Sequence, residues 1–219
     1  MLWAISSILC IIPSLTIIYY ALQLPKSVLY LYHPLLMSIA YILIFTTLAH
    51  QLRKQVTAKW SILKDKRKVH SYGMIAAAVM AIAGFFVIYI NKELKPDSSD
   101  KSFSELHFTS WHGKFGLLTT ISLFIQVLLG LSTFFKQARI LPENVGVSDY
   151  RRYHAFFGIV FSISSCLVLV TAFQTGWFAK QFEAGWKLYA VQYSFSAIIV
   201  FAYGLIVLQV YHRYRNTSI

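Results

Sequence analysis

Six long stretches of this chain contain no charged residue. Asp, Glu, Lys and Arg are absent from residues 1–25, 27–52, 69–91, 115–135, 153–179 and 188–212. A helix of about 20 apolar residues crosses the hydrocarbon core of a bilayer, which is roughly 30 Å thick, whereas membrane-barrel strands have only about 10 residues of alternating polarity. The stretches therefore predict an all-α integral membrane protein, built as a six-helix bundle. We expect its helices near residues 2–24, 31–51, 69–91, 112–135, 153–177 and 187–211.

The expected helices account for most of the chain, so we expect residues 1–219 to form a single transmembrane domain. The first stretch lacks the basic beginning of a signal peptide, and it is longer than such a peptide's apolar core of about 7–15 residues. We therefore interpret it as the first membrane helix. The lipid bilayer is the first partner that the sequence predicts.

The formal net charge of +12 follows from where the basic residues lie. Most of the 20 Lys and Arg residues fall between the second and third expected helices, between the fourth and fifth, and in the C-terminal tail. Basic residues gather in the cytoplasmic loops of membrane proteins, so we expect both termini on the cytoplasmic side. No basic stripe with interleaved aromatic residues remains, and a nucleic-acid partner is excluded.

Four of the seven histidines stand at the N-terminal starts of four consecutive expected helices. They are His33, His70, His112 and His154. One histidine at a membrane interface usually bonds to headgroups or water, but ionisable groups inside a membrane bundle are costly and usually functional. The same position in all four central helices therefore indicates a shared role.

Successive membrane helices run in opposite directions, which sorts these histidines into two pairs. His33 is expected beside His112 near the non-cytoplasmic face. His70 is expected beside His154 near the cytoplasmic face. Each pair offers two neutral imidazoles, enough for both axial positions of a haem iron. The four central helices are thus predicted to hold two haems, with centres about 20–25 Å apart.

Other residues near the histidines bear on this prediction. No Asp, Glu or Cys accompanies them at a matching depth, so a tetrahedral zinc site fits less well. Some phenylalanines are candidates for the space between the haems, although core or lipid-facing positions are their more usual use. These are Phe85, Phe86, Phe124 and Phe161.

The motifs around the histidines resemble those of the cytochrome b561 family over essentially the whole chain. The segment from His33 to Met37, HPLLM, is similar to the family's HP-x-x-M, and the other three histidines take the remaining ligand positions. FTTLAHQLR, which ends at Arg53, replaces the ALLVYRVFR of the ascorbate-vesicle branch, and TSWHG replaces SLHSWxG before the fourth helix. These departures favour the branch of cytochrome b561 domain-containing proteins, types 1 and 2.

The resemblance implies that both haems are non-covalent haems b. It also implies a transmembrane oxidoreductase that carries electrons from cytoplasmic ascorbate to monodehydroascorbate or ferric iron on the opposite face. It also implies a multi-pass protein of the endoplasmic reticulum or cytoplasmic vesicle membranes, often a homodimer. Candidates for contact with the ascorbate anion are the basic residues around the inner haem, which the positive-inside pattern would place there in any case. They are Arg53, Lys66, Arg67, Lys68, Arg151 and Arg152. His107, in the loop before the fourth helix, is a candidate for contact with the outer acceptor, although a solvated histidine is the more usual interpretation.

Two other functions remain open at this point. A six-helix transporter or pH-sensing scaffold without haem would use the histidines as titrating groups, and its purified form would be colourless. A haem protein with a donor other than ascorbate would keep both haems and differ in the reductant that it accepts.

Overall fold

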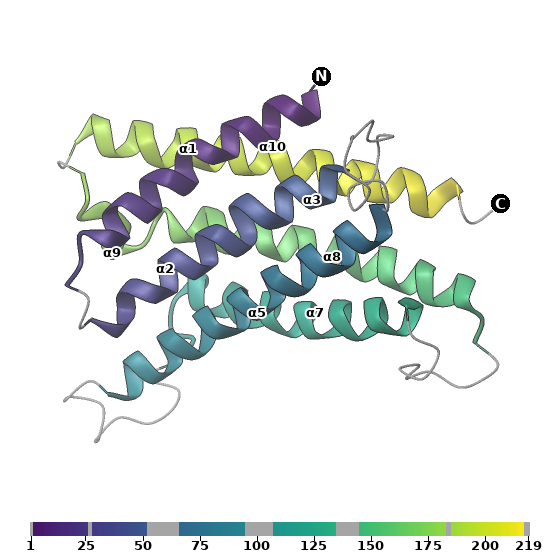
Figure 1. Cartoon of the computed structure of the whole chain (residues 1–219). Helices are drawn as coiled ribbons and strands as arrows, with labels where there is room; N and C mark the ends of the chain where they lie inside the picture. The colour runs from purple at the N-terminus through teal and green to yellow at the C-terminus, as the bar shows by residue number, and fades with distance from the viewer. Residues whose placement is uncertain are drawn as a thin grey trace.

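The computed structural model describes residues 2–25, 28–51, 66–94, 107–134, 145–182 and 185–216, and these ranges contain helices and connecting turns but no strand. Six helical segments are long and apolar enough to cross a membrane, which confirms the predicted all-α six-helix bundle (Figure 1). The elements are α1 (Leu2–Leu22), η1 (Leu29–Leu31), α2 (Tyr32–Met37), η2 (Ser38–Phe45), α3 (Thr46–Gln51), α5 (Lys66–Glu93), α7 (Trp111–Phe134), α8 (Val147–Ala172), α9 (Gly176–Ala179) and α10 (Trp186–Asn216).

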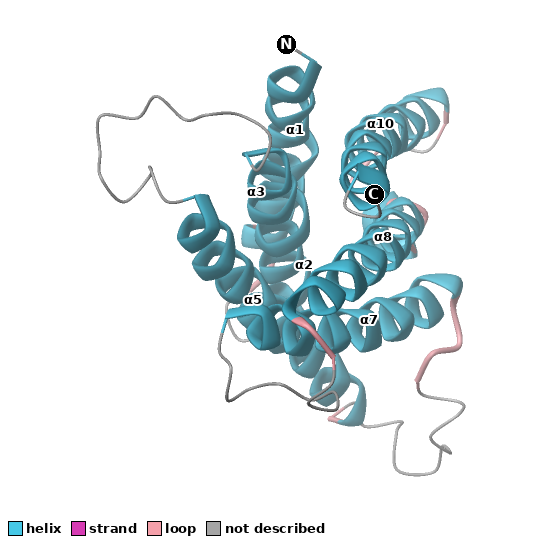
Figure 2. Cartoon of the chain, turned by 90° about the vertical axis from the view of Figure 1, so that its right-hand side faces the viewer, coloured by secondary structure: helices cyan, strands magenta, loops and turns pink. Residues whose placement is uncertain are grey.

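The long helices form two sides of a bundle with a middle layer. In the end-on view of Figure 2, α1 and α10 lie on one side, α5 and α7 lie on the other, and α2 and α8 pass between them. The apolar faces that turn away from the bundle carry exposed large side chains such as Ile12, Val79 and Leu128. This is the pattern expected of helices surrounded by lipid, because lipid is as apolar as these side chains.

The fifth membrane helix begins earlier than its uncharged stretch indicates. The predicted start at residue 153 was wrong, since α8 already begins at Val147. The extended residue Gly146 precedes the helix, and its backbone N–H donates to Asp149 Oδ2 at 3.1 Å. α8 therefore carries a charged first turn ahead of the apolar span. It also ends at Ala172, before the short helix α9, and not at residue 177.

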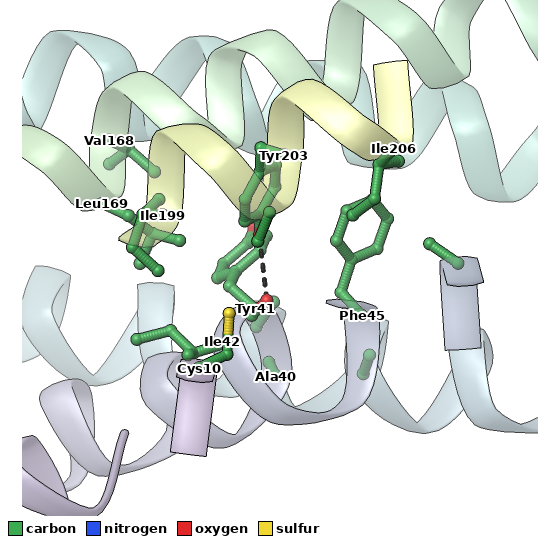
Figure 3. Packing of buried hydrophobic residues seen from close by; sticks show 14 of the residues in the cluster. Cys10, Ala40, Tyr41, Ile42, Phe45, Val168, Leu169, Ile199, Tyr203 and Ile206 are labelled. Atoms are coloured by element: carbon green, nitrogen blue, oxygen red, sulfur yellow. Dashed lines mark hydrogen bonds between the residues drawn. The ribbon is translucent and has the colours of Figure 1, made fainter. Parts of the chain in front are cut away.

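The second membrane helix changes its winding halfway along. Residues Ser38–Phe45 form a π-helix between the α-helical turns of α2 and α3. Stretches of π-helix are rare and frequently occur at functional sites. Here the Tyr203 hydroxyl of α10 donates to the Tyr41 carbonyl at 2.9 Å, which Figure 3 shows as a dashed line. The Ser14 and Ser38 hydroxyl oxygens lie 2.7 Å apart, so polar groups of α1 and α10 hold this segment on both sides.

Aromatic rings fill the centre of the bundle around the same segment. Phe45 packs edge-on against Phe161 with ring centres 5.0 Å apart, and it stacks with Tyr203 at 5.5 Å. Tyr41 lies against Phe161 at 6.0 Å. These four residues are buried, and we call them the central aromatic cluster. They join η2 to α8 and α10.

Replacing Tyr203 with phenylalanine is expected to lower the free energy of unfolding by about 1 kcal/mol, because a hydrogen bond is lost while the ring is kept. Denaturant titration of the purified protein in mild detergent measures this difference. Tyr211→Phe, at an exposed tyrosine of the same helix, is the matched control and should leave the stability unchanged. Equal stabilities of the parent and both variants would show that the hydroxyl does not hold η2.

Candidate functional site

The structure brings the four histidines together in two pairs. His33 of α2 and His112 of α7 have ring centres 6.2 Å apart at an interplanar angle of 79°. His70 of α5 and His154 of α8 have ring centres 6.4 Å apart at 86°. Because α2 and α7 run opposite to α5 and α8 (Figure 1), the pairs lie toward opposite ends of the bundle.

The spacing within each pair suits a metal held between two imidazoles. A metal–imidazole nitrogen bond is about 2 Å long, as for zinc, and a ring centre lies about 1 Å behind its nitrogen, so two axial rings are held with centres about 6 Å apart. Both pairs have this separation. Within the described ranges no group of three or more His, Cys, Asp or Glu side chains could hold a metal ion. Two facing imidazoles, as in each pair, match the axial ligation of haem.

The hydrogen bonds of the first pair leave the right nitrogen for a metal. His33 Nδ1 lies 2.9 Å from the Gly84 carbonyl oxygen, and His112 Nδ1 lies 3.0 Å from the Val168 carbonyl oxygen. A carbonyl oxygen can only accept a hydrogen bond, so each Nδ1 carries a proton and is the hydrogen-bond donor. Nε2 of each ring then keeps its lone pair, as is usual for histidines that bind metals.

His154 is oriented by a side chain instead of the main chain. Its Nε2 lies 3.4 Å from Nε2 of Gln126 on α7. Its Nδ1 is buried and has no hydrogen-bond partner in the ranges that the structure covers. A histidine that binds a metal through one nitrogen donates from the other, and a half-turn of the Gln126 amide would present the oxygen that accepts. Gln126 Oε1 is itself buried and unpaired among the same residues.

Each histidine pair opens into a cavity between the helices. The His33/His112 cavity has an empty volume of about 1360 Å³, and the His70/His154 cavity about 1050 Å³, part of each being open to the surroundings of the bundle. Both are lined mostly by apolar and aromatic side chains, as cofactor sites usually are. Gly130 lies where a Cβ atom would come within 3.2 Å of His154 Cε1. The residues present therefore fit a flat apolar group ligated by two histidines.

His107 lies inside the first cavity, although its loop position favoured a solvated ring. Its side chain lines the His33/His112 cavity and is 4% exposed. Nε2 is 2.6 Å from Glu93 Oε1, and the ring stacks on Tyr89 at 4.3 Å. Glu93 and Tyr89, four residues apart on α5, were not predicted as site residues. Their spacing on one helix face was the signal that could have indicated them.

An unusual turn places the next residue over the same cavity. Phe108 has φ of 56°, in the left-handed region that bulky residues rarely adopt. Its ring stacks against Phe85 with centres 6.4 Å apart. A Cβ atom at position 113 would lie 3.2 Å from the Phe108 Cα atom, so Gly113 permits this close approach of the loop to α7. Such strained conformations concentrate at functional sites.

Only some of the basic residues predicted to contact ascorbate lie among the residues that the structure describes. Arg53 lies outside the described residues, as do the side chains of Lys66 and Arg67. Lys68, Arg151 and Arg152 are exposed near the starts of α5 and α8, at the His70/His154 end, and none of these three lines that cavity. Arg152 Nη1 lies 3.9 Å from Asp149 Oδ1.

Comparisons with known proteins agree with the motifs. Residues 32–179 match the family model described as eukaryotic cytochrome b561. The chain is 25% identical over 175 residues to the transmembrane reductase CYB561D2 of Bos taurus, and 26% identical over 176 residues to that of Mus musculus. Each alignment covers 79% of this chain and 74% of the relative. No solved structure matches the chain.

Proposed function

The chain belongs to the eukaryotic cytochrome b561 family, and from this premise we propose that it carries electrons across a membrane by means of two haems b, one in each histidine-paired cavity. Membership itself implies haem b binding. The observation that supports a second haem is the presence of two imidazole pairs with nearly equal ring separations, 6.2 Å and 6.4 Å, in separate cavities.

Each part of the chain has a distinct role in this proposal. Bound haem supplies one-electron chemistry, because its iron alternates between ferric and ferrous states. His33 and His112 would hold the haem at one end, kept in orientation by the Gly84 and Val168 carbonyls. At the other end His70 and His154 would have this role. The apolar cavity walls exclude water, so little surrounding solvent has to reorganise when the charge of the site changes.

The proposed donor is ascorbate at the His70/His154 end. Ascorbate is an anion, and Lys68, Arg151 and Arg152 are exposed at that end, where they would attract it. Since basic residues mark the cytoplasmic side, this end and both termini are proposed to be cytoplasmic. The proposed acceptor at the His33/His112 end is monodehydroascorbate or ferric iron.

The proposed enzyme is therefore a transmembrane ascorbate-dependent reductase. The relatives' name, transmembrane reductase, supports the reaction class. The endoplasmic reticulum or cytoplasmic vesicles are the proposed location, and a homodimer is the proposed assembly. An electron crossing the whole membrane changes in energy by about 2.3 kcal/mol per 100 mV of membrane potential, so its rate should respond to that potential.

An absorption spectrum of the purified protein, with haem quantified per chain, tests this function. We expect two haems per chain and the α-band of reduced haem b on addition of ascorbate. Reduction by dithionite but not by ascorbate would keep the haems and reject the donor. A colourless preparation from haem-replete cells would reject the function and favour a transporter or a pH-sensing scaffold.

Replacing His107 with alanine is expected to slow electron delivery to the outer acceptor several-fold without changing the haem content. The reason is that the ring lines the His33/His112 cavity and is fixed by Glu93 and Tyr89. Stopped-flow oxidation of the reduced protein by ferric citrate measures the rate. His212→Ala, at an exposed histidine near the end of α10, is the control, and an equal effect of both substitutions would remove His107 from the acceptor site.

A further inference from the structure

Tyr41 connects the two cavities. Among the residues that the structure describes, it is the one side chain that lines both the His33/His112 cavity and the His70/His154 cavity. Phe45 and Phe161 of the central aromatic cluster line the His70/His154 cavity and not the other. On the same turn of η2, Ile42 lines the other. Tyr41 is therefore the partition between the two sites.

The fold holds this partition in place from two directions. Tyr41 lies within the π-helical turn of η2, and the Tyr203 hydroxyl donates a hydrogen bond to the Tyr41 carbonyl oxygen at 2.9 Å. Figure 3 shows Tyr41 and Tyr203 together in the packed centre of the bundle. The Tyr41 ring rests against Phe161 at 6.0 Å, and the residue is only 5% exposed. A ring so enclosed has little freedom to leave the space between the cavities.

We propose that Tyr41 is the bridge through which electrons pass between the two haem sites. This inference rests on the proposed function. Electrons tunnel more readily through closely packed atoms than across an empty gap, because the orbitals of the intervening atoms lower the barrier. Tyr41 is the shared wall, so its ring supplies those atoms to both sites at once.

The electron balance of the step leaves the tyrosine unchanged. One electron leaves the ferrous iron at the His70/His154 pair, which becomes ferric, and reaches the ferric iron at the His33/His112 pair, which becomes ferrous. No bond to Tyr41 forms or breaks, and its phenol keeps its proton throughout. The ring, and not the hydroxyl, is therefore the part that matters.

The test measures internal electron transfer in Tyr41→Leu, which keeps an apolar side chain but removes the ring. The haem-loaded parent and variants are placed in sealed vesicles with a membrane-impermeant photoreductant on one side. A flash reduces the nearer haem, and absorption or rapid-freeze EPR follows the arrival of the electron at the farther one. Random orientation does not matter, because transfer in either direction passes Tyr41.

We expect Tyr41→Leu to slow the transfer several-fold while Tyr41→Phe keeps the parental rate. Haem per chain, the EPR spectrum of each ferric haem and both reduction potentials should stay unchanged, so the slower rate cannot come from a lost haem or a changed driving force. Phe195→Leu is the matched control, since it removes a buried aromatic ring that lines neither cavity. It should keep the parental rate.

Two results would overturn the bridge: a parental rate in Tyr41→Leu, or an equal slowing in Phe195→Leu. If Tyr41→Leu loses a haem, Tyr41→Met replaces it, because methionine fills irregular space in cores, and the same results decide. A colourless parent protein would instead reject the proposed function, before any variant is compared. The two failures are therefore distinguishable.

Discussion

Replacing His154 with leucine is expected to lower the haem content from two per chain to one. The low-spin signal that disappears should be the one that also disappears in His70→Leu. Both histidines belong to one pair, with ring centres 6.4 Å apart, and axial ligation by two histidines requires both rings. Pyridine haemochrome analysis gives the haem content, and EPR of the ferric protein identifies which haem is lost.

The other pair provides the complementary half of the same experiment. His33→Leu and His112→Leu should remove the signal that the first two variants keep. Electron transfer across sealed vesicles should fall to the background rate in all four variants, because each interrupts the path. His212→Leu is the control, since this histidine is exposed and lines neither cavity. If the two variants of one pair removed different signals, the pairing would be wrong.

Gly130→Val is the second substitution for which we expect a large effect. A Cβ atom at this position would lie 3.2 Å from His154 Cε1, and the two methyl groups of valine extend further into the cavity. Displacement of the ring should weaken haem retention at this pair about 10- to 100-fold, the range found when groups that orient a metal ligand are lost. Titration of the apoprotein with haem, followed by absorption, measures this affinity.

Gly204→Val is the control for this substitution, because it changes helix propensity in the same way without crowding a neighbouring side chain. Gly204 of α10 has no atom within 4 Å of its ideal Cβ position, so Gly204→Val should retain both haems. The His33/His112 haem should be unaffected in Gly130→Val, since Gly130 lines only the other cavity among the described residues. Full haem affinity in Gly130→Val would mean that His154 can move aside without losing its ligand geometry.

The six helices could be predicted from the sequence because a bilayer excludes charge, and the gaps between charges therefore mark the spans. The same rule failed at the start of α8. The uncharged stretch begins after Arg152, but the helix already begins at Val147 and includes Asp149, Arg151 and Arg152. A helix in water tolerates charges that lipid does not. Uncharged stretches thus indicate membrane thickness better than helix length.

The pairing of the histidines followed from topology alone, whereas the residues around them depended on helix rotation. Phe86 and Phe124 were candidates for the space between the haems, but they are 54% and 49% exposed on the outer faces of α5 and α7. Of the other two candidates, Phe85 lines the His33/His112 cavity and Phe161 lines the His70/His154 cavity. Tyr41, in the π-helical segment η2, lines both and was not predicted. No periodicity in an almost wholly apolar segment indicates such a change of winding.

The two ends of the bundle differ in how far their ligand geometry depends on sequence. His33 and His112 are oriented by main-chain carbonyls, which every residue type possesses, so substitutions at positions 84 and 168 leave an acceptor in place. His154 depends on the side chain of Gln126, which a single substitution can remove or replace with an anion. With a haem in each site, as proposed, a substitution at Gln126 would shift the reduction potential of the His70/His154 site. The main-chain acceptors would hold the potential of the His33/His112 site more nearly constant, so related chains are expected to differ more in the first potential than in the second.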